Sequence, residues 1–234
     1  MKKVLIGIQA RSTSKRLPNK CNRQIGGIPM LMWVVNACMV AGRFLESTAE
    51  VHVAVLIPKD DPIGTFYGAS VSILEGDEND VLSRYVNALE LYQADYVVRI
   101  TADCPHIPPH HITKHVRAAI TKGRDLTTNV HYRSFKEGWD CEVLSARLMK
   151  WIGQNADSDY DREHVTSLVS VGKPFPFMHS PDGLPSICHI MQNVDESHIK
   201  TSIDTMEEFE AAEAMYQAFR EKKLAATNSG IFYT

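Results

Sequence analysis

Short apolar runs alternate with amphipathic segments along the first half of the chain. The runs predict buried strands at Val4–Gln9, Val51–Ile57, Val71–Leu74 and Tyr96–Ile100. Between them, helices are expected to begin near Pro29, Pro62, Asp80 and His110. Alternation of strand and helix is typical of βαβ units, so we predict an α/β fold with a mostly parallel sheet flanked by helices.

Residues 124–190 have a less regular pattern, with short strand-like stretches, a helix near Ala146–Gln154 and a proline-rich segment at 174–185. A last helix is expected from Met206 to about Lys223. The chain contains no internal repeat, low-complexity segment or clear linker. We therefore expect a single domain over residues 1–234, with a smaller β-rich excursion at about 124–190.

Composition excludes several classes of protein. Of 234 residues, 44% are hydrophobic and 23% are charged, which is ordinary for a folded globular chain. No apolar run approaches the roughly 18 residues of a membrane span, and the first residues are too soon polar for a secretory signal. Five cysteines without a CxxC pair argue against a disulfide framework or structural zinc. We expect a cytoplasmic protein with reduced thiols and no membrane contact.

Positive charge is concentrated near the N-terminus. Residues 1–45 carry eight Lys and Arg side chains and no acid, and the rest of the chain holds all 28 Asp and Glu. A nucleic-acid surface usually shows a broader basic excess, so this cluster favours a confined anion site and no nucleic-acid partner. The alternative is a basic cluster on a solvated face.

The segment Gln9–Lys20 follows the first predicted strand and is the strongest chemical signal. It combines four cations with three hydroxyls, the groups that bind polyphosphate through forked, point-charge and hydroxyl contacts. It matches neither the GxxxxGK[ST] nor the GxGxxG pattern. The alternative is a solvated basic loop. The cations are Arg11, Lys15, Arg16 and Lys20, and the hydroxyls are Ser12, Thr13 and Ser14.

Two carboxylates are candidates for a metal site. Asp103 lies one turn after the fourth strand, and Asp204 follows a short apolar stretch before the last helix. Mg²⁺ is bound by few protein carboxylates together with substrate phosphates, which suits both positions. The alternatives are a turn-forming role for Asp103 and helix capping by Asp204 or Thr205. The segment Tyr160–Val165 is either an active-site wall or a helix start with intrahelical pairs.

Taken together, these segments resemble the sugar cytidylyltransferases, in the branch of spore-coat polysaccharide biosynthesis protein F. Enzymes that activate deoxy-octulosonate and neuraminic acids with CTP are more distant relatives. The resemblance covers nearly the whole chain, from residue 9 to about 216. Its motifs are Gln9–Arg11, Ser14–Lys20, Gly26–Met30, Asp60–Pro62, Gly76 with Asp80–Tyr85, Arg99–Pro105, Gly138–Val143, Asp161–Thr166 and Asp204–Glu210.

The resemblance implies a Rossmann-like nucleotidyltransferase fold, a homodimer and a cleft that binds CTP with Mg²⁺. It assigns Asp103 and Asp204 to the metal. It places Arg11, Lys20 and Asp103 in the catalytic machinery. The nucleotide contacts that it implies are Ala10, Arg11, Ser14, Arg16, Lys20, Arg84 and Asp103.

The sequence departs from the family pattern in four places. Asn19 replaces the glycine before Lys20, and Asn enters left-handed conformations more readily than most residues. Ile28 replaces a common lysine, and Lys15 stands where threonine is usual. Ser202 occupies the position of a second aspartate in neuraminate enzymes, which weakens the case for a second protein-held metal.

The expected reaction is transfer of CMP from CTP to an acidic or other sugar, with release of pyrophosphate, for surface polysaccharide or glycan biosynthesis. The sugar is expected under residues 130–190, in contact with Asp140, Glu142, Arg162 and His164. One alternative is a nucleotidyltransferase of other base specificity or a glycosyltransferase that uses a nucleotide sugar. A further alternative is an inactive binding protein of the same fold.

Overall fold

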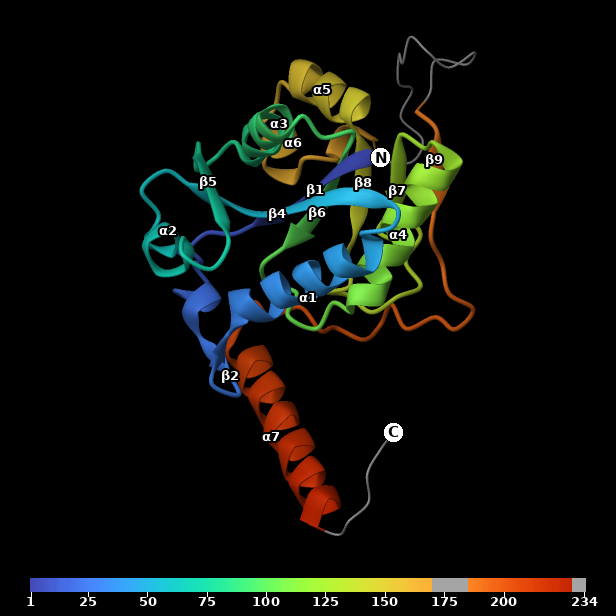
Figure 1. Cartoon of the computed structure of the whole chain (residues 1–234). Coiled ribbons are helices and arrows are strands. Elements are labelled where there is room, and N and C mark those ends of the chain that lie inside the picture. The colour runs from blue at the N-terminus through green and yellow to red at the C-terminus, as the bar shows by residue number, and fades with distance from the viewer. Residues whose placement is uncertain (170–184, 229–234) are drawn as a thin grey trace.

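A seven-stranded sheet forms the centre of the computed structural model, which describes residues 1–169 and 185–228, the last seven through their backbone alone (Figure 1). The strand order in this described part is β5-β4-β1-β6-β8-β7-β9. The first four strands in that order are mutually parallel, which confirms the predicted fold class. The strands are β1 (Lys2–Gln9), β4 (Ala49–Pro58), β5 (Ser72–Gly76), β6 (Tyr96–Thr101), β7 (Leu126–Thr128), β8 (Glu142–Ser145) and β9 (Ile187–His189).

Helices cover both faces of the sheet, with α1 (Met30–Leu45) and α4 (Pro109–Lys122) on one side. The other side carries α3 (Val81–Tyr92), α5 (Ala146–Asn155) and α6 (Asp159–His164) (Figure 1). Side chains of β1 alternate between the two layers, as strand geometry requires. Ile6 and Ile8 pack in the core shared with α1 and α4, whereas Leu5 packs with α3 and α5.

The predicted helix starts agree closely with the structure. The side chain of Asp80 accepts a hydrogen bond from the Ser83 amide at 2.8 Å and caps α3. Asp61 caps the short helix α2 (Pro62–Tyr67) through the Ile63 amide at 3.0 Å. Capping by aspartate satisfies amides that have no partner within the helix, so these turns fix where each helix begins.

The strands within residues 124–190 extend the main sheet. β8 pairs antiparallel with β6 and with β7, and β7 pairs parallel with β9. The predicted helix near Ala146–Gln154 is α5. The proline-rich segment at 174–185 lies outside the described residues, except for its last position.

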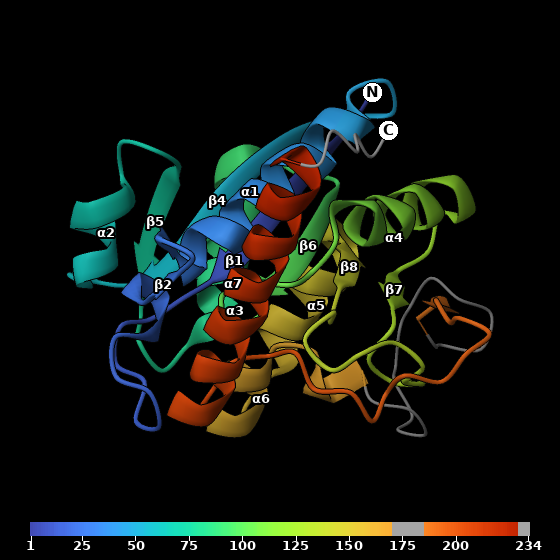
Figure 2. The same ribbon diagram turned by 90° about the horizontal axis from the view of Figure 1, so that it is seen from below.

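The C-terminal helix α7 (Met206–Asn228) extends away from the body of the molecule (Figure 1). Its first half packs on the two-stranded hairpin of β2 (Gln24–Ile25) and β3 (Ile28–Pro29) beside α1 (Figure 2). Tyr216 meets the ring of Trp33 edge to face, with centroids 5.6 Å apart. Gly26 has φ +60°, and a Cβ there would lie 1.9 Å from the Tyr216 ring, so this contact requires glycine.

Strand order places a binding crevice at the carboxyl end of β1. The chain passes from β1 through α1 to β4 on one side, and later enters β6 on the other side of β1. Ligands bind at such switch points in open α/β sheets, because the loops diverge there. Among the described residues, no helix combines the length and the hydropathy that a membrane span requires.

Candidate active site

A cleft of about 970 Å³ opens at the carboxyl ends of β1 and β6. Its walls are the basic loop after β1, the start of α3, the turn after β6, and α6. Asp204 reaches it from the segment before α7. The lining residues are Gln9, Ala10, Arg11, Thr13, Ser14, Lys15, Arg16, Lys20, Cys21, Glu78, Asn79, Val81, Arg84, Ala102, Asp103, Asp159, Glu163, His164 and Asp204.

At one end of the cleft, one ammonium group joins two carboxylates. Lys20 Nζ lies 3.0 Å from Asp103 Oδ2 and 3.0 Å from Asp204 Oδ1. The guanidinium of Arg16 lies 3.1 Å from the same Asp204 oxygen, and Lys200 lies 3.4 Å from its Oδ2. The two predicted metal ligands therefore converge, although they come from distant parts of the chain.

The opposite charges of this cluster outweigh the cost of burying them. Burial disfavours the charged form of Lys20, but the carboxylates of Asp103 and Asp204 outweigh it, so its pKa lies above the ordinary value. Burial likewise opposes ionisation of Asp103, yet the Lys20 charge and nearby hydrogen bonds hold the pKa of Asp103 below its usual range. Lysine and aspartate are therefore both charged at neutral pH, ready to bind phosphate and a cation.

The carboxylates of Asp103 and Asp204 also fit a divalent cation. One oxygen of each lies 3.0 Å from the Lys20 ammonium, so the two carboxylates face the same point of the cleft. Mg²⁺ commonly takes one or two protein carboxylates and completes its shell with water and substrate phosphates. The described residues contain no cluster of three or more His, Cys, Asp or Glu side chains suited to a metal. The site therefore fits an ion that the protein and a nucleotide hold jointly.

Asp204 is not the cap of α7. Thr205 Oγ1 accepts a hydrogen bond from the Glu208 amide at 3.3 Å. Glu208 in turn accepts from the amides of Asp204, at 2.6 Å, and Thr205, at 3.0 Å. This is a capping box, which satisfies the first amides of the helix without the Asp204 side chain. The Asp204 carboxylate is consequently available to the cations of the cleft.

The basic loop, Gln9–Lys20, is held in place by Asp61, which lies outside this segment of the sequence. Asp61 Oδ2 accepts from the Ser12 amide at 2.9 Å and from its hydroxyl at 3.0 Å. Asn19 adopts the left-handed conformation, with φ +56°, directly before Lys20. The conformational demand on Asn19 is predictable from the sequence, whereas the anchoring role of Asp61 was not predicted. The signal was present, because Asp61 also begins a helix at the same sheet edge.

The remaining predicted nucleotide residues lie along the cleft. Arg11 lies 3.5 Å from Glu163 on the opposite wall, with both side chains about half exposed. Ser14 Oγ accepts from the Leu17 amide at 3.4 Å. Arg84 is buried, and its Nη1 donates to the carbonyls of Ala10, at 3.5 Å, and Leu56, at 3.0 Å. The structure thus brings every predicted nucleotide and metal residue to one cleft.

The four predicted sugar contacts do not lie together. His164 lines the cleft and contacts Tyr160, with ring centroids 4.3 Å apart and ring planes tilted by 49°. Asp140 forms a bidentate ion pair with Arg133, at 2.7 and 2.9 Å, and is not among the residues that line the cleft. Glu142 is 1% exposed and inside the sheet.

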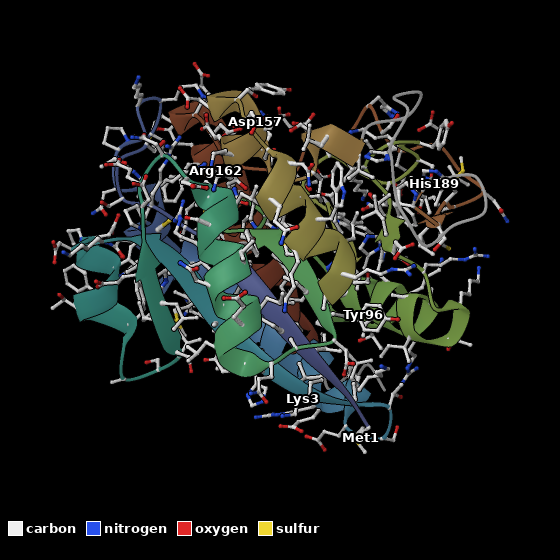
Figure 3. The ribbon with its side chains drawn as sticks, turned by 90° about the horizontal axis from the view of Figure 1, so that it is seen from above. Met1, Lys3, Tyr96, Asp157, Arg162 and His189 are labelled. Carbon is white, nitrogen blue, oxygen red and sulfur yellow. The ribbon has the colours of Figure 1, made fainter. Side chains whose placement is uncertain are left out.

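The fourth predicted sugar contact, Arg162, pairs with the helix-capping Asp80 at 2.6 Å and lies outside the cleft lining. Figure 3 shows Arg162 beside the first turn of α3. Of the four, only His164 faces the cleft directly.

Several lining residues were not among the predicted contacts: Gln9, Glu78, Asn79, Asp159 and Glu163. Glu78 Oε1 accepts from the Thr13 hydroxyl at 2.9 Å and ties the basic loop to the loop after β5. Asp159 and Glu163 belong to α6, the segment for which an active-site wall was one of two interpretations. Both residues lie within residues 124–190, where the hydrophobic pattern is irregular. The sequence therefore did not indicate that α6 faces β1.

Sequence comparisons identify the family. Residues 5–228 match the family described as "Cytidylyltransferase". An uncharacterised protein of Methanocaldococcus jannaschii is 28% identical over 88% of this chain and 80% of its own length. Spore coat polysaccharide biosynthesis protein SpsF of Bacillus subtilis is 25% identical over 95% and 90%. A 3-deoxy-manno-octulosonate cytidylyltransferase of Colwellia psychrerythraea is 30% identical over 47% and 39%.

Solved structures share the fold. A cytidylyltransferase from Leptospira borgpetersenii superposes with a TM-score of 0.80, at 24% identity over the full length of both chains. A CMP:2-keto-3-deoxy-manno-octonic acid synthetase complexed with CTP gives 0.64, at 15% identity over 93% of this chain and 99% of that one. The chain belongs to the cytidylyltransferase family and is a CTP-using nucleotidyltransferase.

Proposed function

We propose that this protein transfers CMP from CTP to a sugar and releases pyrophosphate, for the synthesis of a surface polysaccharide or other glycan. The observation that carries the proposal is the convergence of Lys20, Asp103 and Asp204 within 3.0 Å contacts, beside Arg16. A triphosphate needs cations along its length, and a reacting α-phosphate needs its charge neutralised at one point. The cleft has cationic side chains for the triphosphate and a pair of carboxylates for a metal ion at the α-phosphate.

In this proposal, Arg11, Arg16 and Lys20 bind the β- and γ-phosphates, and Ala10, Ser14 and Arg84 line the nucleotide. Arginine pairs with two phosphate oxygens at once, while lysine supplies a compact charge. The anchoring of Ser12 by Asp61 holds this loop in place before the nucleotide arrives. The groups act mainly by alignment and charge neutralisation, because phosphoryl transfer asks for little covalent chemistry from the protein.

Asp103 and Asp204 would hold Mg²⁺ together with the phosphates of CTP. When bound, the ion would neutralise charge on the α-phosphate and favour in-line attack by a sugar oxygen. The Lys20 ammonium holds the pKa of Asp103 below its usual range, so that this carboxylate is ionised before the ion arrives. Thr101 and Pro105 stand two positions on either side of Asp103, so the DxD pattern of many metal-dependent glycosyltransferases is absent from this turn. This favours nucleotidyl transfer over glycosyl transfer.

The acceptor would enter beside α6, where His164 faces the cleft. We propose that residues 124–190 contribute sugar and dimer contacts and that the protein is a cytoplasmic homodimer. The five cysteines support a reducing compartment, since all are buried and unpaired. Sedimentation analysis tests the dimer: a single species of one-chain mass at micromolar concentration contradicts it.

Pyrophosphate release tests the proposed reaction. The protein is incubated with Mg²⁺, each of the four nucleoside triphosphates in turn, and a panel of acidic and neutral sugars. We expect release with CTP and a subset of the sugars. Release with a triphosphate other than CTP would favour the alternative base specificity. Binding of CTP without turnover on any sugar, and with no release above a blank, would favour an inactive binding protein.

A further inference from the structure

Gln9 is the last residue of β1, and its side chain lines the cleft. The Arg99–Glu142 ion pair fixes this side chain. Arg99 Nε donates to Gln9 Oε1 at 3.1 Å, and Arg99 Nη1 donates to Glu142 Oε2 at 2.9 Å. The three residues lie on one face of the sheet across β1, β6 and β8. The Gln9 amide therefore has a fixed support.

The support is itself well anchored. Glu142 is 1% exposed and also accepts from the Thr166 hydroxyl at 3.0 Å. Burial opposes the charge on Arg99, but the adjacent Glu142 carboxylate outweighs it and raises the Arg99 pKa. Breaking such a pair would leave a buried charge uncompensated, so the pair holds its geometry. Glu142, predicted as a sugar contact, instead positions a cleft residue from inside the sheet.

This arrangement decides which atoms of Gln9 face the cleft. An arginine Nε–H can only donate, so the group that meets it must be the amide oxygen. The amide nitrogen then points away from Arg99, and no described protein group accepts a hydrogen bond from it. The Gln9 amide nitrogen therefore presents hydrogen-bond donors to a ligand.

The floor beside Gln9 suits a flat ring. Ala10 and Ala102 follow β1 and β6 directly, and the Ala102 amide donates to the Gln9 carbonyl at 3.1 Å. Both alanines line the cleft and are nearly buried, so no bulky side chain occupies the floor. Arg84, the buried cation on this side, is likewise only a donor. A ring placed here meets donors and small apolar groups.

Cytosine and uracil differ at the edge that such a site would read. Cytosine presents acceptors at O2 and N3, whereas uracil carries a hydrogen on N3 and cannot accept there. Both rings accept at O2, so N3 is the position that distinguishes them. We propose that the Gln9 amide, fixed by Arg99 and Glu142, donates to N3 of cytosine and selects CTP over UTP. This inference rests on the proposed function, because it takes CTP as the nucleotide substrate.

Titration calorimetry of CTP and UTP, with Mg²⁺ present, tests the inference on three variants. Gln9→Glu keeps the volume and the Arg99 contact but turns an acceptor toward the ring. Gln9→Leu removes the amide at similar volume. Gln154→Glu makes the same change as the first variant on an exposed position of α5 and serves as the control. Melting temperatures establish that each variant is folded.

We expect Gln9→Glu to narrow the ratio of CTP to UTP affinity by about tenfold, since the donor that faces N3 of the ring becomes an acceptor. Gln9→Leu should narrow it less, and Gln154→Glu should leave it unchanged. An equal loss of affinity for both nucleotides in Gln9→Glu, or an unchanged ratio in both Gln9 variants, overturns the inference. If the Gln9 inference fails in this way but the wild-type protein binds CTP tightly, the proposed function still holds. If the wild-type protein binds neither CTP nor UTP, both the Gln9 inference and the proposed function are overturned.

Discussion

The ammonium of Lys20 lies 3.0 Å from the Asp103 carboxylate, at the point where the basic loop after β1 meets the turn after β6. Because Asp204 contacts the same ammonium, Lys20 shares the two carboxylates proposed for the metal. In the proposed site, this lysine would have two effects. It would attract the triphosphate, and it would compete with a free divalent ion for the same oxygens.

Replacing Lys20 should therefore separate nucleotide affinity from metal affinity. We expect Lys20→Met to weaken CTP binding about tenfold or more, through loss of a charge-assisted contact. The same variant should bind Mn²⁺ alone more tightly, because no ammonium neutralises the carboxylates. Calorimetry with CTP and paramagnetic titration with Mn²⁺ measure the two effects. Lys15→Met, which removes a lysine of the same loop with no described ion pair, is the comparison. Weaker Mn²⁺ binding by Lys20→Met would contradict the shared-site geometry.

Substitution at Asp204 separates metal binding from helix capping. Asp204→Asn should abolish metal-dependent turnover with little change in stability, because an amide removes the charge while the cap belongs to Thr205 and Glu208. Thr205→Ala should instead cost about 1 kcal/mol of stability and preserve the metal dependence. Chemical denaturation and turnover against Mg²⁺ concentration measure both. Normal turnover by Asp204→Asn would remove this carboxylate from the site.

The fold was predictable where the spacing of apolar residues and the capping or turn residues indicate the same element. The strand of β1 and the helix after Asp80 were recoverable from apolar runs and a cap, since both depend on local signals. The strands between residues 124 and 190 were not placed in the sheet. β7 and β9 are three residues each, and their pairing depends on contacts with distant segments. Such contacts leave little pattern in a short stretch of sequence.

The buried histidines of α4 should make stability depend on pH. His111 and His115 are 2% and 0% exposed, and burial lowers their pKa values to about 3 and about 4. The folded state therefore prefers neutral imidazole. Their contribution is complete above the unfolded pKa near 6.5 and is lost as the pH falls below it, at about 1.4 kcal/mol per pH unit for each group.

Denaturation between pH 7 and 4.5 tests this expectation. His115→Met should flatten the fall in unfolding free energy across this range. His110→Gln, on the exposed side of the same helix, should not. Equal pH dependence in the protein and in His115→Met would show that the buried imidazole is not the titrating group.

The left-handed residue before Lys20 provides a test of loop geometry. Asn19→Gly should preserve stability and CTP affinity, because glycine adopts φ +56° without strain. Asn19→Ala should cost about 1 kcal/mol, the usual penalty for a Cβ in this conformation. Because the strain falls next to Lys20, we expect weaker CTP binding as well. Equal affinities in the two variants would show that the loop tolerates either residue.

The candidate site was predictable to the extent that its groups belong to motifs. Asp103 and the cations of the basic loop follow strands whose carboxyl ends share one edge. Glu142 could not be assigned correctly, because a carboxylate in a short strand has the same sequence pattern whether it faces a ligand or an arginine. Gln9 was missed because it ends an apolar run and carries no charge. Its role depends on Arg99, which only the register of β1 and β6 brings into contact.

Transfer of label from [α-³²P]CTP tests whether this cleft catalyses cytidylyl transfer. The protein, Mg²⁺ and each sugar of the panel are incubated with the labelled nucleotide, and products are separated before and after phosphatase treatment. We expect a phosphatase-resistant CMP–sugar whose formation matches pyrophosphate release and disappears in Asp103→Asn. Label that appears only as free CMP, or a labelled product formed equally by Asp103→Asn, would contradict cytidylyl transfer at this site.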